Sequence, residues 1–450
     1  MKQTWAMLCV LAASLAVHAQ DKNFDLSKYK FPDYKRHELE LNFNSNGNSD
    51  RYYAVHPSLS NLARTKLDRS NSSFNSRINI GYQFENFTRK QIDQITSGLN
   101  GYYRYHKSKN LDEYTKESQP QIGGFFQASR RNYLTEDKVF IEGLTYLDFN
   151  ISKSKSTYDS STNTDISTSN YLTLSAGLGV GTGRIERVND LWQGYYILEK
   201  LKQQNSLSRD LQEQDIFEFS RFISVLKNKR FFDARLRKIA ELQSLDSIMH
   251  TQNLIDYSDI SYFTTLNDYW SYGSFWERKS GKELKFQLLP EFTSEYYKSS
   301  NSASYSPTKA NLISKVLFDC SKQLNLSWER NVHIDVINTT LIAKNGDESE
   351  NYPGNLISTH ASFGYGFFPD SRTRLGFTGM YSGNEYPDYE GESMTKYWMN
   401  NFTLNFAANY FISPQLQITG NFNGNYGFSG HNSWRNHNIN YNFGLRYAIF

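Results

Sequence analysis

The stretch Gln415–Phe428 reads QLQITGNFNGNYGF, and its residues alternate between two chemical kinds along its length. Successive side chains of a β-strand point to opposite faces, so one face of this strand is amide-rich and the other is apolar, aromatic or glycine. The run is longer than an ordinary strand of about 5–6 residues. A strand that crosses hydrocarbon needs about 9–11 tilted residues, apolar toward lipid and polar toward a lumen, so this stretch is predicted to span a membrane.

The composition of the whole chain agrees with strands of this kind. Tyr, Phe and Trp make up 16% of the 450 residues, and membrane β-barrels place aromatic residues in girdles at both interfaces. The mean hydropathy of −0.65 argues against a helical membrane protein, which needs about 20 consecutive apolar residues per span. With 49 basic and 46 acidic residues the chain is nearly neutral, so no nucleic-acid partner is predicted.

Residues 1–19 have the pattern of a cleaved signal peptide. An apolar run, Trp5–Val17, leads to Val17-His18-Ala19, which fits the small-residue cleavage rule. The polar residues 20–36 are then a periplasmic lead-in. Outside the leader Cys320 is the only cysteine, so no internal disulfide is predicted.

Other amphipathic segments repeat the alternation, and the connections between them are long and short in turn. Membrane barrels have short turns on one side and long loops on the other. The predicted fold is an all-β transmembrane antiparallel barrel of about 14 strands, with 12 or 16 as alternatives. Its strands 1–6 occupy residues 37–183 and its strands 7–14 occupy residues 274–450. The segments are 37–44, 74–87, 95–107, 119–131, 138–152, 168–181, 283–297, 309–321, 324–341, 356–368, 373–381, 396–411, 415–428 and 438–450.

The connection after the sixth strand breaks this rhythm. In residues 184–273 apolar residues recur at three- and four-residue steps, which indicates helices. A single amphipathic helix is rarely stable, but three or four can bury a shared face, so we predict a periplasmic α-helical insertion. Its expected apolar face consists of Val188, Leu191, Tyr195, Leu198, Leu201, Ile216, Phe219, Ile223, Leu226, Phe232, Leu236, Ile239, Leu242, Leu245, Met249, Ile260, Phe263 and Leu266.

The leader, the alternating strands, the alternating connection lengths and the terminal Phe450 together resemble a Gram-negative outer-membrane β-barrel protein of porin-like size. The resemblance is one of architecture and covers the mature chain except the helical insertion. It implies a place in the outer membrane, contact with outer-membrane lipid and insertion by the barrel assembly machinery. Phe450 departs from the family pattern, because it is one residue out of phase with the apolar face that ends at Ile449.

The polar face of the predicted strands is the best place to look for function. Neutral amides hydrogen-bond water and sugars without selecting strongly for charge. Such a wall suits a hydrated solute path, since the interior of a barrel widens with strand number. The alternative is that these side chains simply fill the interior together with water. The lumen-lining candidates are Gln415, Gln417, Asn421, Asn423, Asn401, Asn405, Asn440, Asn442, Arg446, Glu329, His333, Asp335 and His360.

Among these candidates, Glu329, His333 and Asp335 share one strand face, and they invite a metal or acid–base interpretation. A metal site needs convergent ligands with supporting hydrogen bonds, which strand spacing alone does not provide. An ionic ladder is the favoured interpretation, with His360 as the only possible further ligand. No metal ion and no cofactor are therefore predicted.

No G-x-S-x-G nucleophile motif was found in the chain. The run Gly179–Gly183, GVGTG, matches neither G-x-G-x-x-G nor a phosphate-binding loop. Glycines that ease the chain out of the barrel wall are the better interpretation of this run. The chain is therefore expected not to be an enzyme.

The leading hypothesis is a pore or transporter for a hydrophilic solute or export product, with the helical insertion as a gate or docking module. The alternative is a non-conducting surface adhesin or assembly scaffold that acts through extracellular loops at Ser45–Ser73, Asn345–Asn355 and Ser382–Thr395. A basic joint in the insertion could dock a periplasmic protein or a cell-wall partner, or it is only a solvated helix surface. The docking candidates in this joint are Lys227, Lys229, Arg230, Arg235, Arg237 and Lys238.

Overall fold

The computed structural model of the chain describes most of the sequence. The described residues are 29–57, 64–110, 113–135, 138–158, 164–227, 234–272, 277–300, 302–325, 327–345, 355–386, 397–413, 416–429 and 435–447. The predicted signal peptide and the first part of the lead-in lie outside these residues.

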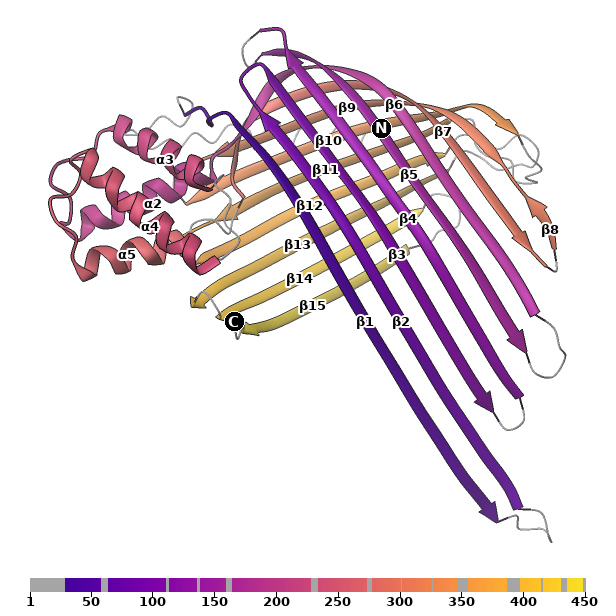
Figure 1. Cartoon of the computed structure of the whole chain (residues 1–450). Coiled ribbons are helices and arrows are strands. Elements are labelled where there is room, and N and C mark those ends of the chain that lie inside the picture. The colour runs from indigo at the N-terminus through magenta and orange to yellow at the C-terminus, as the bar shows by residue number, and fades with distance from the viewer. Residues whose placement is uncertain are drawn as a thin grey trace.

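Within the described residues, fifteen strands form one antiparallel sheet in which strands adjacent in the sequence lie side by side (Figure 1). All strands except β8 (Ser302–Tyr305) lie on one path, and β8 pairs only with β7. The antiparallel architecture predicted from the sequence is confirmed, with one short strand more than the fourteen expected. The strands of the path are β1 (Tyr34–Pro57), β2 (Arg64–Phe87), β3 (Gln91–Asn110), β4 (Glu113–Tyr133), β5 (Val139–Tyr158), β6 (Thr164–Arg187), β7 (Lys279–Ser299), β9 (Thr308–Gln323), β10 (Trp328–Asn345), β11 (Asn355–Phe367), β12 (Thr373–Tyr386), β13 (Tyr397–Ser413), β14 (Leu416–Ser429) and β15 (Arg435–Tyr447).

One face of the sheet, called the outward face, carries an apolar band. Register partners share a face, and rows of exposed apolar partners cross neighbouring strands. Leu41, Ile80 and Leu99 form such a row on β1–β3, and Phe406 and Phe422 belong to another on β13–β14. Soluble proteins rarely expose a contiguous apolar patch of more than a few hundred Å². A sheet face of this kind is suited to contact with lipid.

The first strands continue well beyond the apolar band, which corrects one prediction. The expected long polar loop at Ser45–Ser73 is mostly sheet, because β1 continues to Pro57 and β2 begins at Arg64. Outside hydrocarbon both faces of a hairpin can be polar. The alternation of polar and apolar residues that marks a strand then disappears, although the backbone hydrogen bonds between the two strands continue. Figure 1 shows β1 and β2 projecting furthest. The expected loop at Ser382–Thr395 also begins as strand, since β12 continues to Tyr386.

The remainder of that loop and nearly all of the expected loop at Asn345–Asn355 lie outside the described residues.

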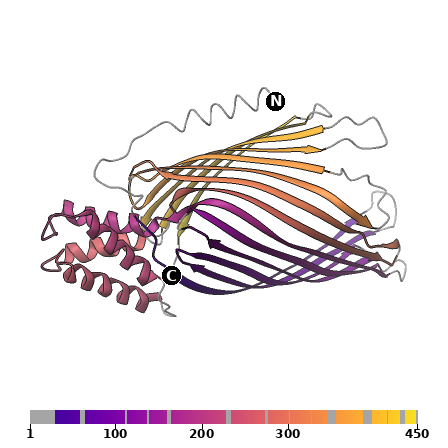
Figure 2. The ribbon, with the colours of Figure 1, turned by 90° about the horizontal axis from the view of Figure 1, so that it is seen from above.

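The strands are strongly staggered, and the sheet is curled (Figure 2). A row of register partners that begins at Tyr34 on β1, at the end of the sheet nearest the helices, reaches Ser429 at the opposite end of β14. Tilted barrel strands require a stagger of this kind. In the part of the chain that the structure describes, β1 pairs only with β2 and β15 only with β14, so both are free edges. These two ends of the sheet are called the helical end and the far end below.

Helices occupy the connection between β6 and β7, as the periodicity predicts. Leu198, Phe219 and Leu245 are fully buried in their shared core. Ile260 and Phe263 are exposed, against expectation, because the side of their helix that carries them faces away from the bundle. Among the described residues, no helix is both long and apolar enough to cross a membrane. The helices are α2 (Asn189–Gln203), α3 (Glu213–Lys227), α4 (Ala234–Thr251) and α5 (Ile260–Tyr272), and together they are called the helical subdomain.

Two further outcomes concern single residues of this prediction. Ile239 on α4 is exposed, because the apolar residues of that helix are spread around it and do not form one stripe. The side chains of Phe232 and Leu236 lie outside the described residues.

The helical subdomain lies beyond the helical end of the sheet (Figure 2). The segment before β1 joins its core, since Tyr29 and Phe31 are buried with the helical residues and the Tyr29 ring lies 5.9 Å from that of Phe217. On the opposite side of the curled sheet, the Tyr272 ring lies 5.8 Å from that of Phe411 at the end of β13. The subdomain therefore contacts both early and late strands.

Candidate functional site

The candidate site is the inward face of the sheet, opposite the apolar band. Asn405, Asn423 and Asn440 are register partners across β13, β14 and β15, so three amides form one row on this face. Gln415 lies outside the described residues. The other lumen-lining candidates that share this face of β13–β15 are Asn401, Asn421, Asn442, Gln417 and Arg446.

Four titratable residues form a chain across β9, β10 and β11. His333 Nδ1 lies 2.6 Å from Asp319 Oδ1, and His333 Nε2 lies 3.5 Å from Asp335 Oδ2. Asp335 Oδ1 in turn lies 2.7 Å from His360 Nδ1. The histidine side chains keep 39% and 43% of their surface exposed, so the chain is open to water.

The sequence pointed to three of these residues and missed Asp319, which the register places opposite His333. Of the expected ladder of Glu329, His333 and Asp335, only His333 and Asp335 lie next to each other, and His360, expected only as a possible further ligand, extends the chain from Asp335. In the part of the chain that the structure describes, no group of three or more His, Cys, Asp or Glu residues could hold a metal ion.

Glu329 belongs to a different environment, although it shares the face of His333. It is buried at the helical end, where its Oε2 accepts a hydrogen bond of 3.3 Å from Gln323 and lies 3.9 Å from Arg278. Sequence spacing placed Glu329 in the same ladder as His333 and Asp335. The structure separates them, because the strand carries Glu329 into the layer that underlies the helices.

A second ionic cluster, which the sequence did not reveal, lies on the inward face of β4, β5 and β7. Arg131 Nη1 donates to Glu283 Oε2 at 2.7 Å, and Nη2 donates to Glu142 Oε1 at 3.0 Å. Gln287 donates to the other oxygen of Glu142 at 2.8 Å. Both carboxylates and Gln287 are buried. These polar groups fill the inward face near the helical end, whereas the Asp–His chain is open.

The glycines of β6 make this cluster possible. Gly179 and Gly181 present no side chain on the inward face, and a Cβ on Gly181 would overlap the Phe140 ring. A Cβ on Gly179 would lie 3.1 Å from Gln287. Side chains of β5 and β7 therefore meet above β6. Gly183 has a φ of +93°, which favours glycine, but β6 stays paired with β7 as far as Arg187, so the expectation that the chain leaves the wall at these glycines is wrong.

Three arginines fix the helical end of the sheet. Arg278 is buried between the rings of Trp192 on α2 and Phe368, with its guanidinium carbon 4.0 Å and 4.4 Å from their centroids. Burial lowers the pKa of Arg278, while Tyr196 and Glu329 oppose that shift. Arg278 also donates to Gln323 Oε1 at 2.6 Å. This residue thus joins the helical subdomain to the β11–β12 turn and to β9.

The other two arginines also lie over aromatic rings at the helical end of the sheet. Arg372 lies 4.4 Å from the Tyr272 ring of α5 and is ion-paired with Asp268. Arg184 lies over the rings of Phe87 and Tyr133 at 4.4 Å and 5.0 Å. Each guanidinium lies over at least one aromatic ring, a contact worth about 2 kcal/mol or more when desolvated.

The basic joint of the insertion is partly engaged within the subdomain. Lys227 Nζ donates to Asp190 Oδ1 at 2.6 Å, and Arg237 Nε donates to Glu241 Oε1 at 2.7 Å. Lys238 is half-buried. The candidates outside the described residues or side chains are Lys229, Arg230 and Arg235.

No protein-family model matches the sequence, and no curated protein matches it. Similar solved structures are outer-membrane β-barrel proteins. The ferric yersiniabactin uptake receptor FyuA from Yersinia pestis aligns with 88% of this chain at 8% identity and a TM-score of 0.39. The chain spans half the length of FyuA.

Two other solved structures align over most of both chains. The translocator domain of the autotransporter NalP from Neisseria meningitidis aligns with 83% of this chain and 88% of its own, at 9% identity and a TM-score of 0.29. A TodX monoaromatic hydrocarbon channel mutant aligns with 93% and 91%, at 9% identity and a TM-score of 0.31. These TM-scores are below 0.5, so the class is assigned from the chain's own sheet.

The sheet defines a class of protein. It is antiparallel, curled and staggered, its outward face is apolar, and its inward face carries ions and amides. Charged side chains in a membrane face away from lipid, toward a polar interior. The chain therefore has the architecture of a transmembrane β-barrel protein, with a helical subdomain inserted between β6 and β7.

Proposed function

We propose that the chain is an outer-membrane protein that passes a hydrophilic solute or an export product, with the helical subdomain as its periplasmic gate. The observation that carries the proposal is the Asp319–His333–Asp335–His360 chain. It places four titratable groups on the inward face at the level of the apolar band, and its histidines stay open to water. Desolvated charges are costly, so a water-filled interior explains these groups best.

The buried cluster around Arg131 supports the gate. Its ion pairs line the inward face near the helical end, and the helical subdomain lies beyond that end. A solute that enters from the far end would meet this layer after the open Asp–His chain. In this proposal the helical subdomain moves to let the solute pass.

The proposal includes the partners that the class implies. Outer-membrane lipid would cover the apolar band, and the barrel assembly machinery would insert the chain. A periplasmic protein or cell-wall partner would approach the exposed side of the helical subdomain, where Ile260 is 84% exposed. No chemical reaction belongs to the proposed function.

The test is single-channel conductance of the purified full-length protein in a planar bilayer. Two variants release the gate in different ways. The first replaces α2–α5 (Asn189–Tyr272) with a short turn, and the second is Arg278→Ala, which removes the guanidinium between Trp192 and Phe368. We expect small or rare openings in the native protein and larger or more frequent ones in both variants.

Arg209→Ala is the matched control, because Arg209 is ion-paired with Asp215 inside the subdomain and its contacts are all with that subdomain. It should leave the conductance unchanged. If the native protein and both variants are silent in bilayers, the pore proposal fails.

A specific observation favours the alternative, a non-conducting surface adhesin or scaffold. The β1–β2 hairpin continues as polar sheet far beyond the apolar band, where Arg51 is paired with Asp68. Binding of the native protein to a surface or a partner, lost when Arg51–Arg69 is replaced by a tight turn, would support this alternative if no current is found.

A further inference from the structure

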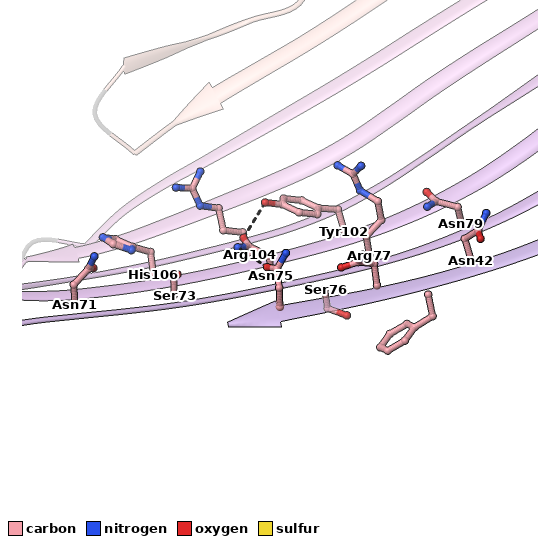
Figure 3. A pocket seen from close by; sticks show the side chains of 13 residues that line it. Asn42, Asn71, Ser73, Asn75, Ser76, Arg77, Asn79, Tyr102, Arg104 and His106 are labelled. Carbon is pink, nitrogen blue, oxygen red and sulfur yellow. Dashed lines mark hydrogen bonds between the residues drawn. The ribbon is translucent and has the colours of Figure 1, made fainter. Parts of the chain in front are cut away.

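We infer that the inward wall of β1–β3 binds an acidic oligosaccharide. This inference deepens the proposed function, since it names the class of solute that the interior would receive. The wall holds a recess of about 930 Å³ midway along β1 and β2 (Figure 3). Ligand sites in proteins have volumes of about 300–1,000 Å³. The residues that carry the argument are Asn46, Asn75, Arg77, Tyr102, Arg104 and His106.

Arg77 lies over an aromatic ring on the neighbouring strand. Its guanidinium carbon lies 5.5 Å from the centroid of Tyr102. Tyr102 donates its hydroxyl hydrogen to Asn75 Oδ1 at 3.1 Å, and Asn75 Nδ2 donates to Asn46 Oδ1 at 3.2 Å. This chain of contacts holds Arg77 in place while its N–H groups stay available to a ligand.

Arg104 supplies a second guanidinium on the same wall. It is the register partner of Asn75, so it lies diagonally from Arg77 at a spacing of roughly 7–8 Å between backbone positions. Both arginines are exposed, and in the described part of the chain neither is within ion-pair distance of a carboxylate. Arginine binds carboxylates through two parallel hydrogen bonds, so the pair can hold two acidic groups of one ligand.

Acidic groups on this face lie at the edges of the recess. The register places Glu117 opposite His106 and Asp50 opposite Asn71. Deeper in the interior, Glu38 and Glu40 line a smaller cavity. The centre of the recess is therefore cationic, and its margins limit how far an anionic ligand extends.

The remainder of the wall suits hydroxyl groups. Asn42, Asn44 and Asn79 line the recess, and each amide can donate and accept hydrogen bonds. A small inorganic anion would use only the two arginines, and a neutral sugar would use only the amides. A ligand with carboxylates on a polyhydroxylated chain uses both sets, which is why an acidic oligosaccharide is the best match.

The test is equilibrium binding of fluorescently labelled tetragalacturonate to the full-length protein in detergent, followed by anisotropy. We expect Arg77→Gln and Arg104→Gln each to weaken binding about tenfold and the double variant about a hundredfold, because each removes one charge-assisted contact. The control is Arg51→Gln, an exposed arginine on the outward face of the same hairpin that is paired with Asp68. Its affinity should stay within about twofold of the native value.

Three results would overturn the inference. The first is native affinity in the double variant, and the second is equal binding of a neutral tetrasaccharide. The third is arginine-dependent binding of lipopolysaccharide vesicles without binding of the soluble probe, which would assign the recess to a membrane glycolipid. Because binding is measured without a current, the two proposals fail separately. If the protein conducts but does not bind the probe, only the binding inference fails. If it binds the probe but gives no current, only the pore proposal fails.

Discussion

Arg131 on β4 and Glu283 on β7 are joined by a hydrogen bond of 2.7 Å that passes over the two intervening strands, β5 and β6. Sheet neighbours do not reach so far when the strands between them carry side chains. The inward glycines of β6 clear the way, and Glu142 on β5 adds a second carboxylate to the same guanidinium. The interior is therefore organised by contacts across several strands as well as by the backbone ladder.

Removing Arg131 should strongly destabilise the sheet. Arg131→Met leaves Glu142 buried without a cation and leaves Glu283 with Lys285 alone, and an uncompensated buried charge costs about 3–5 kcal/mol. The measurement is the free energy of unfolding in urea, in lipid vesicles. The neighbouring Arg130→Met is the control, because Arg130 is exposed and lies 3.6 Å from Asp93, a pair worth at most about 1 kcal/mol. Equal losses in the two variants would contradict a special role for Arg131.

A methyl group at Gly181 should impair assembly. Its Cβ would overlap Phe140, which is fully buried, and would lie 2.7 Å from the backbone oxygen of Leu284. Overpacking of a well-packed interior typically costs about 1–3 kcal/mol. Gly143→Ala is the matched control, since a Cβ there meets nothing within 4 Å. The folded fraction, read from the heat-dependent shift on an electrophoresis gel, should fall for Gly181→Ala and stay unchanged for Gly143→Ala.

The stability of the helical subdomain should depend on pH through Asp215. Arg209 donates to both oxygens of Asp215 at 2.7 and 2.8 Å, and this contact lowers the pKa of that carboxyl below its usual 3.8. A lowered pKa in the folded state stabilises the subdomain above pH 3.8, and the contribution is lost as the pH falls through the folded-state value.

The measurement compares the native protein with Asp215→Asn by circular dichroism at 222 nm, with temperature, at pH 6 and at pH 3. The thermal midpoint of the native protein should be the higher one at pH 6, and the difference should shrink at pH 3. A difference of equal size at both pH values would mean that the carboxylate charge is not its source.

When the free edges β1 and β15 pair and close the barrel, the apolar faces of both strands should lie on the outward side. Leu41 on β1 and Phe443 on β15 belong to the outward apolar face, and a one-residue slip would turn one strand inside out. Leu41→Cys with Phe443→Cys should therefore form a disulfide in the membrane-inserted protein, in a Cys320→Ser background. Glu40→Cys with Phe443→Cys is the out-of-phase control and should stay reduced. Crosslinking of the control alone would show that the apolar face of one edge strand points inward in the closed sheet.

The fold was predictable where the signal is local. Alternation in Gln415–Phe428 identifies a strand and its two faces, and the steps from Leu191 to Leu201 identify a helix, because both patterns depend only on near neighbours in the sequence. The boundaries of β1 and β2 were not predicted. Ser45–Ser73 lies beyond the apolar band and does not alternate between polar and apolar residues, although most of it is still paired as β-sheet.

The site was predictable only in part, and the reason is the stagger of the strands. His333, Asp335 and His360 could be selected by face, but their partner Asp319 depends on the register of β9 against β10. Glu329 has the same phase as His333, yet it lies in the buried layer at the helical end, because depth along the strand is not encoded in alternation. The contacts of Arg278 with Trp192 and Phe368 have no local signature at all.

The sequence by itself determined which side of each strand meets lipid and where the helices interrupt the sheet, because hydrophobic periodicity is a property of short stretches. Only the tertiary structure decided which polar groups meet. Arg131 and Glu283 are 152 positions apart and are joined by the stagger of four strands and the glycines between them. The register of β2 against β3 sets Arg104 diagonally from Arg77 and thereby helps to form the recess that we assign to an acidic oligosaccharide.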